Sequence, residues 1–90
     1  MSLPYDIEIG DKLRKKLEKL EKKYKSVYNA IIKKTLHIAD NPYIGKPLHG
    51  KLKGKRRVHI GHFVLIYGID EKERRVIFLD FTHHDEAYKQ

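Results

Sequence analysis

The sequence predicts an α+β fold in the order β-α-α-β-β-β, with an N-terminal helical hairpin packed on a small, mainly antiparallel sheet. In the first half, one short alternating segment precedes two stretches whose apolar residues recur at helical spacing. In the second half, three strand-like runs are separated by short turns. The chain has 90 residues, so we expect one domain spanning residues 1–90.

The first strand is predicted from apolar residues that alternate with acidic ones, namely Tyr5, Ile7 and Ile9. Gly10 ends this strand, and Asp11 is the predicted N-cap of a helix that starts at Lys12. That helix carries a narrow apolar stripe on an otherwise charged surface, formed by Leu13, Leu17 and Leu20. Its lysines are expected to form a solvated, salt-bridged face.

The second helix is predicted to begin near Ser26 and to end before Asn41, because a residue that precedes proline is disfavoured in the helical region. The residues expected to point inward are Tyr28, Ile31, Ile32, Leu36 and Ala39. A hairpin of two such helices must bury its apolar stripe against a second layer.

That layer is the predicted sheet, which follows a loop rich in Gly and Pro at residues 41–54. Its strands are predicted at Arg56–Ile60, His62–Ile69 and Arg74–Phe81. The last two contain runs that are apolar on both faces, as is typical of central strands. The polar residues 70–73 between them are short enough for a hairpin connection.

The composition limits the chemistry that the chain can perform and the classes of partner that it can bind. The chain has no cysteine, which excludes disulfides and thiolate chemistry, and it has no apolar run long enough for a membrane span. We therefore expect a cytoplasmic protein without a membrane partner. A net charge of +8 points to nucleic acid, an acidic protein or an anionic surface.

The positive charge is concentrated in one segment. No acidic residue occurs from Asn41 to Ile69, and Gly45 to His62 holds six Lys/Arg and three His in eighteen positions. This pattern indicates polyanion binding first, and acid–base chemistry on a phosphate second. His37 and His49 are expected to be structural or exposed. No Asp, Glu or Cys lies at ligand spacing from the histidines, so we predict no metal and no cofactor.

Three segments in order resemble the RelE/ParE superfamily of toxins from prokaryotic toxin–antitoxin modules: residues 41–50, 57–67 and 83–88. The resemblance covers nearly the whole chain and implies a RelE-like fold. Toxins of the RelE branch cleave mRNA in the ribosomal A site without a metal, and a small antitoxin wraps and neutralises them. The resemblance therefore implies the same activity and the same kind of partner for this chain. The ParE branch poisons DNA gyrase instead. The C-terminal pattern His-His-x-x-x-Tyr is closer to the RelE branch.

The resemblance implies catalytic candidates, which are Arg57, His59, His83, His84 and Tyr88. Two positions depart from the family pattern. Members usually carry Arg where this chain has Val64, and His84 also stands where an Arg is usual. Histidine keeps a positive charge only below its pKa, unlike a guanidinium.

Metal-free RNA cleavage needs a base, an acid and stabilisation of the charge on phosphorus. His59 or His83 would act as base or acid, and Arg57 would stabilise the phosphate. Arg57 and His59 share a face of their strand, and His83 or Tyr88 could meet them there if it follows an adjacent strand. Tyr88 would stack on a base or donate a proton. The candidates for RNA phosphate contacts are Lys51, Lys53, Lys55, Arg56 and His62.

These considerations predict a ribosome-dependent mRNA endoribonuclease that inhibits translation. Its expected partners are the ribosome, mRNA and an acidic or amphipathic antitoxin, and the oligomeric state is left open. One alternative is a toxin that acts by binding alone, on gyrase or on the ribosome. The other is a catalytically weakened member held by its antitoxin. Val64 and His84 favour these alternatives, whereas the basic, His-rich segment opposes them.

Overall fold

The computed structural model of the chain describes residues 3–83. Its helices and strands are β1 Asp6–Ile9, α1 Asp11–Lys23, α2 Lys25–Asp40, β2 Lys46–Pro47, β3 Arg56–Ile60, β4 Phe63–Asp70 and β5 Arg75–His83. Two short 3-10 turns flank β2, η1 at Pro42–Ile44 and η2 at Gly50–Leu52. The predicted α+β order is confirmed, with the two-residue strand β2 added inside the predicted loop. Neither described helix is long and apolar enough to cross a membrane.

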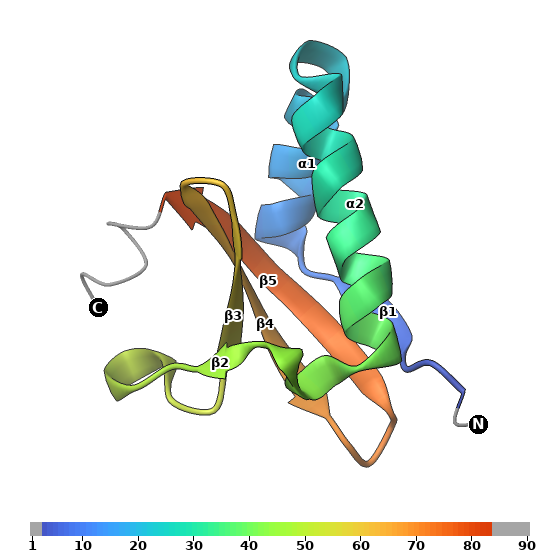
Figure 1. Cartoon of the computed structure of the whole chain (residues 1–90), viewed down its shortest axis with the longest axis vertical. Helices are drawn as coiled ribbons and strands as arrows, with labels where there is room; N and C mark the ends of the chain where they lie inside the picture. The colour runs from blue at the N-terminus through green and yellow to red at the C-terminus, as the bar shows by residue number, and fades with distance from the viewer. Residues whose placement is uncertain (1–2, 84–90) are drawn as a thin grey trace.

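The sheet has five strands in the order β1-β5-β4-β3-β2. β1 pairs with β5 in parallel, and the other three pairings are antiparallel. Both helices lie on the same side of this sheet (Figure 1). We call that side the helix face and the opposite side the open face.

The core lies between the helices and the helix face. Leu13 and Leu17 of α1 are buried there, as predicted, but Leu36 of α2 is 58% exposed and the prediction that it points inward is wrong. α2 buries Ile31 and Ala39, as predicted, and also buries Thr35 and Ile38, which were not predicted to point inward. These four residues follow the helical period, and Leu36 lies about 100° further around the helix than Thr35.

The beginning of α1 also differs from the prediction. Gly10 is the N-cap residue and Asp11 is the first helical residue, with no side-chain capping hydrogen bond at this end. The Asp11 carboxylate still lies in the first turn, where negative charge complements the helix dipole.

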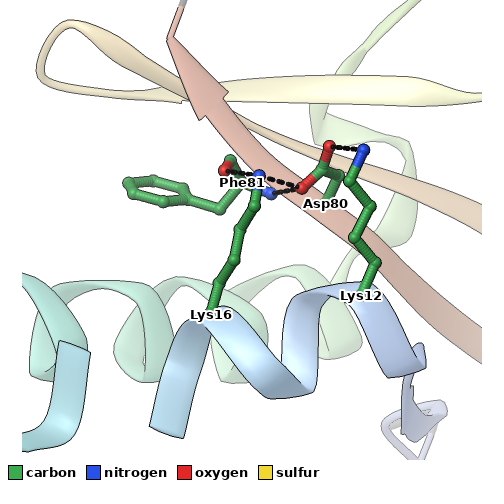
Figure 2. Close-up of polar contacts among 4 residues, drawn as sticks. All are labelled: Lys12, Lys16, Asp80 and Phe81. Atoms are coloured by element: carbon green, nitrogen blue, oxygen red, sulfur yellow. Dashed lines mark hydrogen bonds and ion pairs between the residues drawn. The ribbon is translucent and has the colours of Figure 1, made fainter. Parts of the chain in front are cut away.

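β5 contains a bulge that α1 holds in place. The pairing of β4 with β5 shifts between Ile66 and Tyr67, because Ile66 pairs with Asp80 and Tyr67 with Phe78, which leaves Leu79 as the extra residue. The Asp80 carboxylate forms ion pairs with Lys16 Nζ at 2.7 Å and with Lys12 Nζ at 3.1 Å (Figure 2). Burial alone would raise the pKa of Asp80, but hydrogen bonds from the two lysines outweigh it and hold this pKa below its ordinary value.

A second contact set fixes the segment that leads into the basic region. The buried Tyr67 hydroxyl of β4 donates to the Pro42 carbonyl at 2.7 Å and accepts the Gly45 N–H at 3.0 Å. Burial raises the pKa of Tyr67, so this hydroxyl stays a donor at neutral pH. The segment around η1 is therefore tied to the centre of the sheet.

Candidate functional site

Arg57 and His59 lie together on the open face. Their neighbours in β3, Val58 and Ile60, pack against the core under the helices. Since alternate residues of a strand point to opposite faces, Arg57 and His59 point away from the helices. They share one face, as the sequence predicts, with Arg57 half-buried and His59 exposed.

The floor beside these two side chains is apolar. Val64 pairs with His59 and Ile66 pairs with Arg57, and both are buried. Together with Leu48 they form a small second core cluster, against which Leu52 and Leu79 pack. The position where the resemblance implies an arginine is thus a fully buried valine that supports the open face.

Lysines border this apolar floor. The Lys55 side chain lies over β4, with Cδ 3.5 Å from the place that a Cβ on Gly68 would occupy. Lys51 and Lys53 are exposed on either side of Leu52, the residue that packs on the floor. The open face therefore combines an apolar floor with a cationic border.

Arg56, a predicted phosphate contact, is engaged elsewhere. Its guanidinium donates to the Gly45 carbonyl at 2.6 Å and lies over the Tyr43 ring, 4.9 Å from the centroid. As a neighbour of Arg57 in an extended strand, it points toward the helix face. The structure thus gives Arg56 a role in holding the segment around η1.

His83 lies on the helix face, away from Arg57 and His59. It pairs with Phe63, its ring meets the Phe63 ring edge-on at 5.6 Å, and Phe63 stacks on the core residue Phe81 at 5.0 Å. The expected meeting of His83 with Arg57 and His59 in one site is therefore wrong. The bulge is the reason, because one extra residue moves every following side chain to the other face.

On that side, His83 lines a largely apolar groove of about 540 Å³ between the helical hairpin and the ends of β4 and β5. Its other lining residues include Leu20, Tyr24, Val27 and Phe63. His62, in the turn between β3 and β4, lines an adjoining hollow beside α2. It too lies away from the open face.

The open face gains one residue that the sequence did not single out. Thr82 pairs with Val64 and so comes onto the same face as His59. Only the bulge places it there, and no sequence pattern marks the bulge. His84 and Tyr88 lie outside the described residues, so their roles stay predictions from the sequence. Within residues 3–83, no three His, Asp or Glu side chains gather closely enough to hold a metal ion.

Comparison with known proteins agrees with this architecture. A family model described as "ParE toxin of type II toxin-antitoxin system, parDE" matches residues 7–88. A protein of Methanocaldococcus jannaschii named "Putative toxin RelE4" is 46% identical over 87 residues, covering 96% of this chain and 93% of its own length.

Solved structures show the same fold. A chain of the RelBE2 toxin–antitoxin complex from Mycobacterium tuberculosis has a TM-score of 0.80 at 26% identity, over 93% of this chain and 95% of that one. A chain of the archaeal RelE–RelB complex from Pyrococcus horikoshii has a TM-score of 0.70 at 19% identity, over 90% of this chain and 96% of that one.

Two helices on one side of a five-stranded, mainly antiparallel sheet form the RelE-like fold. Together with the matching family model, this fold identifies the protein as a toxin of a type II toxin–antitoxin system. The chain belongs to the ParE toxin family, within the RelE/ParE superfamily.

Proposed function

We propose that this toxin is a ribosome-dependent mRNA endoribonuclease that uses its open face. The observation that carries the proposal is the placement of Arg57 and His59 side by side on β3, over an apolar floor and inside a border of lysines. A cationic border attracts the RNA backbone, and the buried apolar floor gives Arg57 and His59 a rigid support. The similarity to RelE-named proteins supports the same activity.

The chemistry follows from the two side chains. His59 carries an imidazole, the side chain that most often transfers protons near neutral pH, so it suits the transfer of the 2′-hydroxyl proton. Arg57 carries a permanent charge, and its half-buried position strengthens its attraction for the charge that develops on the phosphate oxygens. The second proton carrier would be Tyr88, for which the sequence predicts base stacking or proton donation.

We further propose a cognate antitoxin as the partner that silences the toxin. The solved relatives from Mycobacterium tuberculosis and Pyrococcus horikoshii are toxin–antitoxin complexes. A net charge of +8 favours an acidic wrapping segment, because complementary charge speeds association and selects the partner.

A toxin that acts by binding alone is the second candidate. The open face lacks a positive charge at Val64, where the family usually has an arginine. It also lacks the imidazole of His83, which lies on the helix face. The matching family model is also that of the ParE toxins. In this case the target would be gyrase or the ribosome, with no RNA cut.

Primer-extension mapping of mRNA in a purified translation system separates the two candidates. We expect discrete cuts that require ribosomes, that vanish with Arg57→Ala, and that persist with Arg14→Ala, an exposed arginine of α1. Intact mRNA at high doses of the folded wild-type protein would overturn the endoribonuclease proposal. A parallel gyrase supercoiling assay would then test the binding alternative.

A further inference from the structure

A hollow of about 360 Å³ lies between α2 and the edge of β3. Its lining residues are Ala30, Lys33, Lys34, His37, His59 and Ile60. We call it the α2–β3 cleft. Four of its six lining residues carry a positive charge or can acquire one, which distinguishes it from the apolar groove beside His83.

The lysines of the cleft are not used to hold the fold. On α1, Arg14 pairs with Glu18, and Lys12 and Lys16 pair with Asp80. On α2, by contrast, neither Lys33 nor Lys34 takes part in an ion pair among residues 3–83. Lys33 and Lys34 line the cleft together without such partners, so their charges favour an external anion.

The charge distribution of the whole chain supports this direction. From Lys22 to Ile69 the sequence has eleven Lys/Arg residues and a single acidic residue, Asp40. The sheet order puts β3 and β2, which belong to this stretch, at the opposite edge from β1 and β5, which carry acidic residues. The cleft therefore lies at the cationic edge of the molecule.

The β3 edge gives an RNA strand a route from the open face to the cleft. β2 pairs with Arg56 and Arg57, and this pairing does not extend along the strand to His59 and Ile60. His59 belongs both to the open face and to the lining of the cleft. A strand whose reacting phosphate lies beside Arg57 can thus continue around this edge toward Lys33 and Lys34.

We propose that the α2–β3 cleft is a second backbone subsite, which binds phosphates of the RNA strand next to the nucleotide held at the open face. This inference rests on the RNA-directed function proposed above. Lys33 and Lys34 act on affinity and strand position, without a part in the cleavage chemistry. Binding at such a site is independent of base sequence and sensitive to salt.

The test measures binding of fluorescent, non-cleavable 2′-O-methyl RNA of about twelve and about three nucleotides by anisotropy, over a range of salt concentrations. The double variant Lys33→Ala/Lys34→Ala is compared with Lys15→Ala/Lys22→Ala, which removes the same charge from exposed positions of α1. Losing two phosphate contacts should reduce the slope of log K against log salt by about 1.4 for the longer RNA, and only in the cleft variant. The short RNA should bind all three proteins alike. Thermal melts verify that both variants fold.

Three results would overturn the subsite. The cleft variant would bind the longer RNA as the α1 variant does; or it would lose affinity only for mRNA-free ribosomes, which would assign the cleft to ribosomal RNA; or it would lose affinity only for an acidic polyglutamate peptide, which would assign it to a protein partner. Failure of the proposed function is distinguishable from all three, because it appears as uncut mRNA in primer extension while the anisotropy contrast remains.

Discussion

Gly45, at the start of the basic segment, packs closely against Tyr67 of β4 and against the backbone of β3. A Cβ at this position would lie 2.3 Å from the Tyr67 hydroxyl oxygen and 2.8 Å from the Arg57 carbonyl oxygen. Both contacts are shorter than atoms of a folded protein tolerate. The glycine therefore lets the segment around η1 pass over β3 and β4 and fixes the backbone of the strand that carries Arg57.

We expect Gly45→Ala to lower the free energy of unfolding by about 1–3 kcal/mol, because the added methyl group forces the backbone or the buried tyrosine to move. Gly68→Ala is the matched control, since its new Cβ would meet only the Lys55 side chain at 3.5 Å and should change stability by less than about 0.5 kcal/mol. Urea denaturation followed by circular dichroism measures both. Equal stability of the two variants would contradict the close packing at Gly45.

The sequence predicts the position of a single residue correctly where the local alternation of a strand alone determines which face the residue occupies. Alternation along β3 places Arg57 and His59 on one face, and the strand has the predicted bounds Arg56–Ile60. Leu36 shows the limit of such patterns. Both it and Ile38 are apolar residues of one helix, and tertiary packing decides which of them is buried.

At the scale of elements, the contact of α1 with the bulge in β5 determines what the open face contains. Without the extra residue Leu79, regular alternation from Phe78 would put His83 on the open face and Thr82 on the helix face. Lys12 and Lys16 hold the bulge through Asp80, and Lys16 also donates to the Phe81 carbonyl. Neither the bulge nor the parallel pairing of β1 with β5 is readable from local patterns, because both depend on contacts between residues far apart in sequence.

The Asp80 contact should make stability depend on pH. A carboxyl whose pKa is lower in the folded state stabilises the fold above its unfolded pKa, about 3.9, and that stabilisation is lost as pH falls through the lower folded value. We expect Asp80→Asn to reduce the free energy of unfolding by about 1–3 kcal/mol at neutral pH. The difference from wild type should shrink as pH falls below the unfolded pKa and through the lower folded pKa of Asp80.

Urea denaturation of both proteins at several pH values measures this effect. Glu18→Gln, which breaks an exposed pair with Arg14, is the control and should change stability by less than about 0.5 kcal/mol. A constant difference between Asp80→Asn and wild type down to the lowest pH would show that the ionised carboxylate is not the stabilising group.

At the scale of the whole molecule, the order of the strands places the acid-poor stretch of the sequence on one side of the protein. The acid-poor stretch forms one edge of the sheet and the flank of α2, and most acidic residues of the described chain lie on α1, β1, β5 and the turn before β5. Composition alone predicts a polyanion partner, but only the topology shows which side of the protein would meet it. The strand order also puts β4 between His83 on β5 and the two residues of β3 that His83 was expected to join.

In the proposed function, the open face, with Arg57 and His59, carries the chemistry. The most direct test is the single-turnover rate of mRNA cleavage on programmed ribosomes for Arg57→Ala, His59→Ala and His83→Ala. We expect the first two variants to lose about 10²–10⁴ in rate, because a charge stabiliser or a proton carrier is removed, and His83→Ala to stay within about threefold of wild type. Wild-type rates for Arg57→Ala and His59→Ala, or a loss in His83→Ala as large as theirs, would contradict this proposal.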